Sequence, residues 1–229
     1  MKIIKPYAEI LYMDDPKETE KVFEKIENAG RTCYKSTSEK PGHAVDFTAY
    51  VVKQQHEAML EHAGMTVRFV VDRGVSHELV RHRMASFAQE STRYCNYSQD
   101  KFGNEITFIK PCFLTEDGNP RSPWGVWYYT MLRAEAAYLD LVNNKGMTPQ
   151  EARCVLPHSL KTEVVMTANF REWRHFFRLR AACETGPAHP QMLEVAVPLF
   201  QKCQKMMPEL FYDIEIPREV LQKYGCQED

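Results

Sequence analysis

Stretches typical of strands alternate with stretches typical of helices along almost the whole chain, and this alternation limits the folds that the chain can adopt. Strands are predicted over residues 2–12, 65–71, 105–109 and 161–168, and helical patterns lie between them. No linker, repeat or low-complexity run divides the 229 residues, which can bury a substantial core. The pattern therefore predicts one domain of the α/β or α+β class.

Capping residues predict where the helices of the N-terminal half begin and end. Asp15-Pro16 begins a helix, and Gly30 is expected to end it. A second helix is predicted over residues 45 to about 60. Ser76 is expected to cap a short helix that carries Arg81-His82-Arg83.

The helix signals of the C-terminal half follow the same logic. Ser122-Pro123 begins a long helix, and Thr148-Pro149-Gln150-Glu151 is a capping box with proline at the first helical position. Asn169, followed by Glu172, is expected to cap the next helix. The final helix is predicted over residues 191–206.

The charge balance argues against one broad class of function. The chain carries 29 basic and 31 acidic residues, which leaves a formal net charge of −2. A general nucleic-acid-binding protein is usually basic overall. Any cationic function must therefore be local, and no nucleic-acid partner is expected.

Cysteine and histidine usage bears on the compartment and on metals. The seven cysteines are odd in number and scattered, without a Cys-x-x-Cys pair, which is typical of reduced thiols. The eight histidines form no metal-binding spacing with acids or cysteines, so no metal is expected. We find no signal peptide and no membrane-spanning segment, and therefore expect a cytoplasmic protein without a membrane partner.

A cationic cluster lies in the middle of the chain. Arg81, His82, Arg83 and Arg93 stand among side chains such as Phe87 that favour partial burial, where an unpaired charge is costly. Planar guanidinium groups suit phosphate and carboxylate, so the cluster predicts anionic, phosphorylated ligands. If the segment is helical, Arg81 and Arg83 point about 200° apart. They would then serve different anions, different parts of one long ligand, or sites in two subunits.

The helix after Asn169 separates its side chains by type. At about 100° per residue, the aromatic side chains share one face and four cationic side chains share the opposite face: Trp173, Phe176 and Phe177 against Arg171, Arg174, His175 and Arg178. Arg180 falls on the aromatic face. Two interpretations stay open, namely that Arg180 pairs with the negative C-terminal end of its helix, or that it pairs with an inward acid or a bound anion.

Four blocks of the sequence, in order, resemble those of one enzyme family. Arg81-His82-Arg83, seven intervening residues, then Ser91 and Arg93-Tyr94 match the signature of flavin-dependent thymidylate synthases. The segments at residues 56–62, 152–157 and 169–180 are similar to the other blocks of that family. The resemblance extends from about residue 30 to about residue 200.

The resemblance implies a methyltransferase that converts dUMP to dTMP. Such enzymes take one carbon from 5,10-methylenetetrahydrofolate and a hydride from FAD that NADPH has reduced, and they use no cysteine nucleophile. The family fold implied is a single α+β domain over residues 1–229, with a mixed, mainly antiparallel sheet packed with helices. The resemblance also implies a homotetramer whose active sites are shared between subunits.

The resemblance assigns residues to the ligands. Contact with dUMP is expected from Glu78, Arg81, Gln89, Glu90, Ser91, Thr92, Arg93, Arg153 and Arg180. Contact with FAD is expected from Ala58, Arg81, His82, Arg83, Gln89, Asn169, Arg171 and His175. Arg180 is expected to be the catalytic residue, because a guanidinium on an apolar face can stabilise negative charge on the uracil ring. For His56 and His62 two interpretations stay open, namely that they line the folate or flavin region or that they are structural, as lone histidines more often are.

Two positions depart from the family pattern, and a rival function stays open. Ala58 stands where many relatives have Ser or Thr near FAD, and Glu78 stands where some have Gln near dUMP. No glycine-rich dinucleotide or phosphate-binding loop is present, so FAD would be held by side chains and subunit contacts. The rival hypothesis is a non-catalytic nucleotide- or RNA-binding protein that uses the same arginines.

Overall fold

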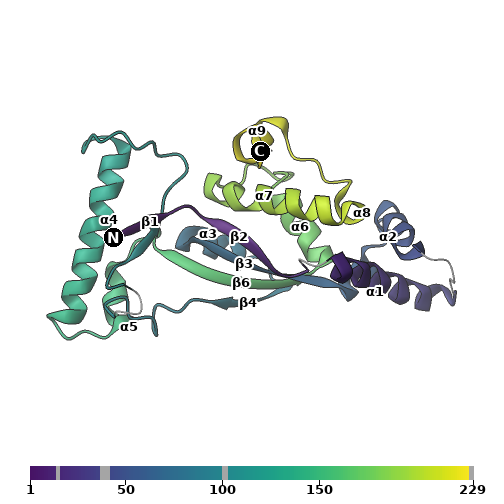
Figure 1. Ribbon diagram of the computed structural model, residues 1–229, viewed down its shortest axis with the longest axis horizontal. Coiled ribbons are helices and arrows are strands. Elements are labelled where there is room, and N and C mark those ends of the chain that lie inside the picture. Colours follow the sequence, from purple (N-terminus) through teal and green to yellow (C-terminus); the bar gives the residue numbers. More distant parts are fainter. Residues whose placement is uncertain (14–15, 37–41, 100–102, 227–229) are drawn as a thin grey trace. The chain divides into compact units, whose positions relative to one another are not determined.

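The computed structural model describes residues 1–13, 16–36, 42–99 and 103–226, which form an α+β fold (Figure 1). The strands are β1 (Lys2–Ile4), β2 (Tyr7–Tyr12), β3 (Gly64–Asp72), β4 (Ala85–Gln89), β5 (Thr107–Ile109) and β6 (Lys161–Asn169). The α-helices are α1 (Pro16–Tyr34), α2 (His43–Lys53), α3 (Arg73–Leu79), α4 (Pro123–Asn143), α5 (Pro149–Ala152), α6 (Phe170–Arg180), α7 (Pro190–Met206), α8 (Pro208–Phe211) and α9 (Arg218–Tyr224). Two short 3₁₀ helices are η1 (Glu57–His62) and η3 (Arg153–Val155).

The strands form a four-stranded sheet in the order β2-β3-β6-β4 and a separate pair, β1-β5. The small pair is parallel, with Lys2 opposite Thr107. The predicted α+β class, with an antiparallel sheet and helices, is confirmed. The single strand predicted over residues 2–12 is divided between the two sheets, because Pro6 has no amide hydrogen to donate to a ladder.

Two helix ends predicted for the N-terminal half are wrong. α1 continues past Gly30 to Tyr34, and the start proposed at Asp15 lies outside the described residues. A Cβ atom at Gly30 would lie 2.3 Å from the Phe47 ring, so the glycine allows α1 and α2 to pack closely. The helix predicted over residues 45–60 is interrupted, because α2 ends at Lys53 and Gln55 adopts a left-handed φ of 57° before η1 begins.

The capping prediction at Ser76 is also wrong. Asp72 caps α3, with its carboxylate accepting a hydrogen bond from the Val75 amide at 2.9 Å, and Ser76 lies inside the helix. α3 ends at Leu79, so residues 81–83 lie in a turn before β4. The helical separation of Arg81 and Arg83 therefore does not apply.

In the C-terminal half, the predicted starts of three helices are confirmed. Ser122 caps α4 by accepting a hydrogen bond from the Gly125 amide at 3.0 Å, and Asn169 caps α6 by accepting from the Glu172 amide at 2.9 Å. The Thr148–Glu151 capping box is present at the start of α5. The predicted helix over residues 191–206 is α7, but it is not the final one, since α8 and α9 follow.

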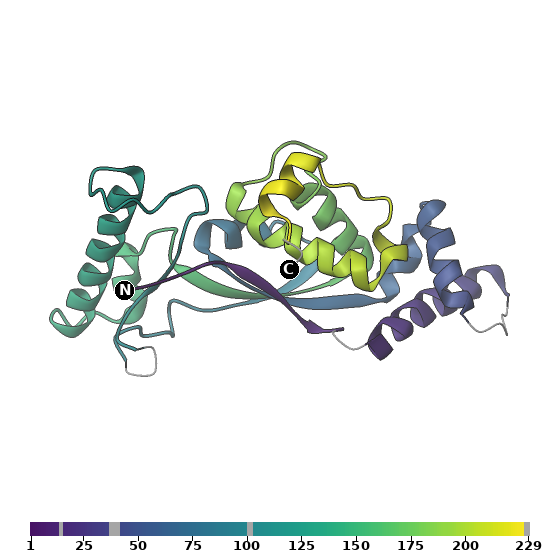
Figure 2. The ribbon, with the colours of Figure 1, turned by 45° about the horizontal axis from the view of Figure 1, so that its top comes forward.

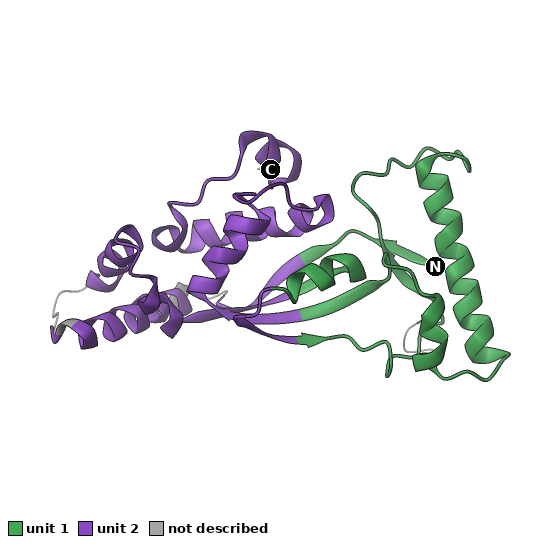
Figure 3. Ribbon diagram, turned by 180° about the vertical axis from the view of Figure 1, so that it is seen from behind, with its two compact units in different colours: residues 1–7, 69–81, 88–164 green, residues 8–68, 82–87, 165–229 purple. Residues whose placement is uncertain are grey.

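The chain divides into two compact units that interleave in sequence (Figure 3). Unit 1 comprises residues 1–7, 69–81 and 88–164, and unit 2 comprises residues 8–68, 82–87 and 165–229. All four strands of the larger sheet, β2, β3, β4 and β6, contribute residues to both. That the chain acts as one domain stays a prediction.

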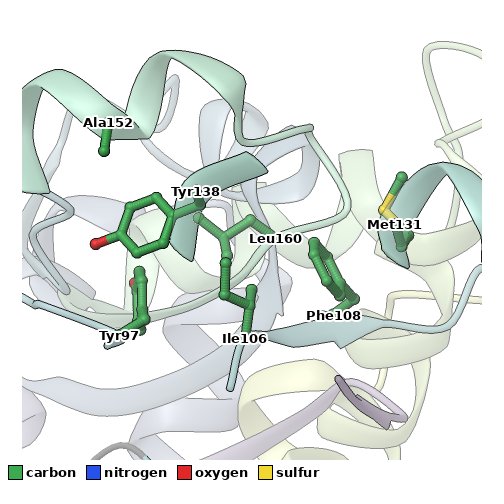
Figure 4. Close-up of a cluster of buried hydrophobic side chains, with 7 residues drawn as sticks. All are labelled: Tyr97, Ile106, Phe108, Met131, Tyr138, Ala152 and Leu160. Carbon is green, nitrogen blue, oxygen red and sulfur yellow. The ribbon is translucent and has the colours of Figure 1, made fainter. Parts of the chain in front are cut away.

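Each unit buries its own apolar side chains. Unit 1 has a cluster around α4, drawn in Figure 4: Tyr97, Ile106, Phe108, Met131, Tyr138, Ala152 and Leu160. In unit 2, α6 packs against α7 (Figure 2), and the ring of Phe177 contacts the rings of Trp173, Phe200 and Phe211 at centroid distances of 5.3–5.9 Å. Such aromatic pairs contribute about 0.5–1.5 kcal/mol each beyond area burial. α6 is thus a firm platform for the polar side chains on its other faces.

Candidate functional site

In unit 1, the loop predicted to bind dUMP begins at Gln89. The side chain of Gln89 is fixed by hydrogen bonds to other residues of the protein. Gln89 Nε2 donates to Ser76 Oγ at 3.0 Å and to Thr162 Oγ1 at 3.2 Å. Arg73, which the sequence reading missed, donates to the same Thr162 hydroxyl at 3.4 Å and to the Glu90 carbonyl at 3.5 Å. The start of the loop is therefore anchored to α3 and β6.

The carboxylate of Glu90 is also engaged within unit 1. It accepts hydrogen bonds from the Tyr97 hydroxyl at 2.9 Å and from Lys161 Nζ at 2.9 Å, and Lys161 also pairs with Glu163 at 2.5 Å. Burial acts against the charged form of Lys161, but hydrogen bonds to Glu163 and Glu90 raise its pKa overall. Burial, reinforced by the Glu90 charge, raises the pKa of Tyr97. Glu90 thus orients the loop through bonds to the protein.

Two exposed cationic side chains lie at the rest of the loop, Arg93 within it and Arg153 from η3. Arg153 Nη1 donates to the buried Thr92 hydroxyl at 3.1 Å. Ser91 Oγ accepts from the Arg93 amide at 3.2 Å, which tightens the turn. The Arg93 and Arg153 residues are exposed, and the Arg93 guanidinium lies over the Tyr94 ring at 5.5 Å. The structure therefore brings Thr92 and Arg153 together, although they lie far apart in sequence.

The two other residues predicted for dUMP in unit 1 lie at the end of α3. Glu78 is half-buried in the last turn of that helix. Arg81 is exposed just beyond it, and its amide donates to the Glu78 carbonyl at 3.2 Å. This backbone bond holds the turn that carries Arg81.

In unit 2, two pockets of about 370 and 430 Å³ share Glu61, Met84 and Asn169 as lining residues. Their volumes are at the low end of the range of about 300–1,000 Å³ for ligand sites. Residues predicted for FAD contribute to them: Asn169 to both, Arg171 and His175 to the first, and Arg83 to the second. His62 also lines the second pocket, whereas Ala58 is an exposed residue of η1.

The lining holds one apolar group that the sequence reading missed. Met84 is 69% exposed and borders both pockets. A thioether in that setting offers an adaptable apolar contact to a planar ring. The position of a methionine directly after Arg81-His82-Arg83 is the sequence signal that could have identified it, although such a side chain favours partial burial.

Several charged side chains that line the first pocket form ion pairs with one another or with neighbouring residues. Arg171 pairs with Glu61 at 2.6 Å. Arg174 pairs with Glu57 at 3.0 Å, donates to both Asp213 oxygens at 2.7 Å, and also donates to the Leu210 carbonyl. Burial opposes the charge of Arg174, yet the bonds to Asp213 raise its pKa overall. Arg171 and Arg174 are thus held in place by carboxylates.

The wheel prediction for Arg174 needs a correction. The sequence placed it on the cationic face with Arg171 and Arg178, which are more open to solvent, but Arg174 is only 1% exposed. The reason is that Leu210 and Asp213, beyond α7, lie against this face and bond to its guanidinium. A helix wheel contains no information about a segment more than 30 residues away.

Arg83 differs from these paired arginines. It is exposed beside the second pocket, and among residues 1–13, 16–36, 42–99 and 103–226 we find no hydrogen bond or ion pair to its side chain. Its guanidinium can therefore meet an anionic group without breaking an internal pair.

Three polar side chains form a chain from Glu172 in α6 through His82 to Arg180; Glu172 and His82 are buried, and Arg180 is half-buried. His82 Nδ1 lies 2.9 Å from Glu172 Oε1, and Arg180 Nε donates to His82 Nε2 at 3.3 Å. Arginine can only donate, so Nε2 must accept, and a neutral ring then carries its hydrogen on Nδ1 and donates it to Glu172. The Phe176 ring packs edge-on against His82 at 5.0 Å.

The protonation of His82 agrees with this assignment. Burial, reinforced by Arg180 and His175, lowers the pKa of His82 to about 4, so the ring is neutral at physiological pH. Burial raises the pKa of Glu172, and His175 partly offsets this effect. The contact is therefore a hydrogen bond from a neutral imidazole to a carboxyl oxygen, and not an ion pair.

These contacts bear on the two interpretations of Arg180. Its Nε donates to the His82 ring, which in turn contacts the Glu172 carboxyl group, so Arg180 is linked to an acid through His82. The sequence reading used Glu172 only to mark the helix start. The missed signal is periodicity, because Glu172, Phe176 and Arg180 recur every four residues and share one face within about 80°.

The described residues contain neither a metal-binding cluster nor a helix that could span a membrane. Within these ranges, no group of three or more His, Cys, Asp or Glu side chains is arranged to hold a metal ion. None of the described helices combines the length and the hydropathy needed to cross a lipid bilayer.

Comparisons with known proteins agree on one family. Residues 17–209 match the family model for thymidylate synthase complementing protein. The flavin-dependent thymidylate synthase of Corynebacterium glutamicum is 31% identical, covering 92% of this chain and 86% of its own length. The Corynebacterium efficiens protein of the same name is also 31% identical, covering 83% of this chain and 79% of its own length.

A solved structure shares the fold. The UMP/dUMP methylase PolB from Streptomyces cacaoi, bound with 5-Br UMP, superposes with a TM-score of 0.69 over 98% of this chain and 97% of its own, at 20% identity. The extent of the family match and the identity to curated relatives lead to one conclusion. This chain belongs to the family of flavin-dependent thymidylate synthases.

Proposed function

We propose that the protein is a flavin-dependent thymidylate synthase, which methylates dUMP to dTMP. The one-carbon donor is 5,10-methylenetetrahydrofolate, and NADPH reduces the bound FAD. The observation that carries the proposal is the Glu172–His82–Arg180 chain, because it ties the Arg180 guanidinium to His82, a residue of the motif by which the family is recognised. Family membership and the pockets of unit 2 support the same function.

The residues around the unit 2 pockets fit a flavin nucleotide. Arg83 offers a guanidinium for a diphosphate, Met84 offers an apolar surface for a ring, and Arg171 and His175 add polar contacts. We assign flavin binding to these residues together with Ala58, Arg81, His82, Gln89 and Asn169. When bound, the flavin supplies the hydride that reduces the transferred carbon to a methyl group. The protein binds and orients it without a glycine-rich loop.

For the nucleotide, unit 1 supplies the phosphate-binding chemistry. Arg93 and Arg153 are exposed, Ser91 and Thr92 precede Arg93 in the loop, and Arg153 donates to the Thr92 hydroxyl. We assign dUMP binding to this loop from Gln89 to Arg93, with Glu78, Arg81, Arg153 and Arg180. The solved methylase bound with 5-Br UMP supports a pyrimidine nucleotide as the ligand class.

Arg180 is the proposed catalytic residue. Its Nε donates to His82, and we assign the contact with the uracil ring to its guanidinium. A fixed positive charge at the ring stabilises the negative charge that makes C5 nucleophilic. No cysteine nucleophile is then needed; the most buried thiol, Cys203, has its pKa raised by burial to about 12, which makes it unreactive.

The remaining parts of the proposal concern assembly and location. We propose one catalytic domain over residues 1–229, assembled as a homotetramer with active sites shared between subunits. The partners are then dUMP, folate and NADPH, in the cytoplasm, without a nucleic acid, a membrane or a metal. Sedimentation of the purified protein measures the oligomeric state.

The decisive test measures dTMP formation from dUMP and methylenetetrahydrofolate, with and without NADPH. We expect product only when NADPH is present, and a yellow protein with flavin absorption. A colourless protein that binds dUMP without turnover would support the rival, a non-catalytic nucleotide-binding protein. Binding of RNA in preference to dUMP would support its RNA-binding form.

A further inference from the structure

We propose that Glu172 is a positioning residue: its carboxyl group sets the ring tautomer of His82 and thereby the orientation of the Arg180 guanidinium. The inference rests on the proposed function, in which Arg180 meets the nucleotide. Glu172 also lines the first unit 2 pocket, which we assign to the flavin, so flavin binding is measured separately; on dUMP it acts only through His82.

The directions of two hydrogen bonds fix the tautomer of His82. Arg180 Nε is a donor at 3.3 Å from His82 Nε2, and the opposite ring nitrogen is 2.9 Å from Glu172 Oε1. Only the tautomer with hydrogen on Nδ1 satisfies both contacts. An acceptor at position 172 selects that tautomer, since the other form would place two hydrogens against each other between His82 and Arg180.

The hydrogen-bond acceptor, the Glu172 carboxyl group, is held rigidly. Glu172 is 7% exposed and His82 4% exposed, so water competes little for either bond. The backbone of Glu172 is fixed by the Asn169 cap at 2.9 Å, and Phe176 supports the ring of His82 edge-on. The carboxyl group therefore has little freedom to leave His82.

Charged and titratable groups of α6 face the His82 ring. Glu172, His175 and Arg180, all from α6 or its C-terminal end, are the groups that bond to His82 or shift its titration. Two of the three disfavour a charged imidazole. Glu172 is thus the group that fixes where the hydrogen of the neutral ring resides.

The test compares three substitutions in the purified full-length protein. Glu172→Gln keeps an oxygen acceptor, Glu172→Leu keeps bulk without an acceptor, and Glu172→Ala removes both. Glu184→Ala is the matched control, because it removes an exposed carboxylate that pairs with Arg178 of the same helix at 3.3 Å. Melting temperatures and flavin absorption check that each variant folds and loads.

The direct readout is the His82 tautomer, measured by ¹H–¹⁵N correlation of ¹⁵N-histidine-labelled protein, which does not depend on turnover. Hydrogen on Nδ1 is expected in the wild type, in Glu172→Gln and in the control. Glu172→Leu and Glu172→Ala should give a mixture or the Nε2 form. An Nε2 form in the wild type would overturn the proposal even if no variant folds.

Kinetics provide the second readout. In Glu172→Leu and Glu172→Ala, kcat and kcat/KM for dUMP should fall together by about 100-fold, as expected for a misplaced transition-state contact. Glu172→Gln should recover most of the rate. Wild-type kcat with an unchanged tautomer in Glu172→Leu would refute positioning by Glu172. An inactive wild type with the Nδ1 tautomer would instead refute the proposed function.

Discussion

The polar networks of the two units treat their central basic group in opposite ways. In unit 1, Lys161 lies between the carboxylates of Glu90 and Glu163, which keep it charged. In unit 2, His82 faces one carboxyl group, from Glu172, while burial, Arg180 and His175 hold it neutral. The balance of acids and cations around a buried base thus decides whether it acts as a charge or as a neutral hydrogen-bond relay.

The difference matches the tasks that we assign to the two networks. The unit 1 network holds a loop that we propose binds a phosphate through Arg93, together with Arg153 of η3. The unit 2 network holds a single guanidinium in one orientation, where a charged imidazole beside Arg180 would repel it. Each prediction below alters one side of this comparison.

The largest effect is expected for Arg180→Ala. Removing a preorganised charge at the uracil should lower kcat by about 10²–10³-fold, whereas flavin absorption should persist. Steady-state kinetics and the flavin spectrum measure the two effects separately. Arg218→Ala, which removes an exposed arginine of α9, is the control and should keep its activity. Undiminished turnover in Arg180→Ala would remove this residue from the mechanism.

The neutral state of His82 predicts a pH dependence of stability. An unfolded histidine gains a proton near pH 6.5, but folded His82 gains one only near pH 4. The unfolded state therefore binds more protons between these values, and lowering the pH from about 6.5 to about 4 destabilises the fold by up to about 3 kcal/mol. Glu172, whose pKa is raised, opposes part of this loss.

The readout is the free energy of unfolding of the wild type minus that of His82→Asn, measured by urea denaturation across this pH range. The difference should shrink as the pH falls and level off below about pH 4. A difference that is flat with pH would mean that His82 titrates normally.

A smaller loss of stability is expected for Asp213→Ala. This change leaves the buried Arg174 with Glu57 and the Leu210 carbonyl as partners, and it should cost about 2 kcal/mol of unfolding free energy. Chemical denaturation measures it against Glu184→Ala, an exposed pair that should cost at most about 1 kcal/mol. Equal costs would show that the burial of Arg174 adds nothing to that pair.

The smallest effect is expected when every cysteine is replaced by serine. If neither network needs a thiolate, a folded variant should keep most of its dTMP-forming activity. The buried Cys203 is the risk to folding, so Cys203→Ala is the substitution to use at that position. Abolished turnover in a variant with a wild-type melting temperature would reopen a nucleophilic role.

Much of the fold could be predicted, because many of its signals are local. The caps at Ser122 and Asn169 and the strand before Asn169 depend on residues within one helical turn or one strand. Asp72 was missed as the cap of α3 because Ser76 offered the same chemistry four residues later. Gly30 was misread because helix-ending glycines and close-packing glycines look alike in sequence.

The same distinction, between local signals and contacts made only in the folded chain, applies to the candidate site. The sequence by itself determined which residue types belong to the motif and, through the four ordered blocks, the enzyme family. The tertiary structure decided that Arg174 is buried against Asp213, that Glu90 is tied to Lys161, and that Glu172 reaches Arg180 through His82. These pairings join residues 39, 71 and 90 positions apart. Burial and partner choice at such distances depend on the folded chain, and periodicity within one helix carries no information about them.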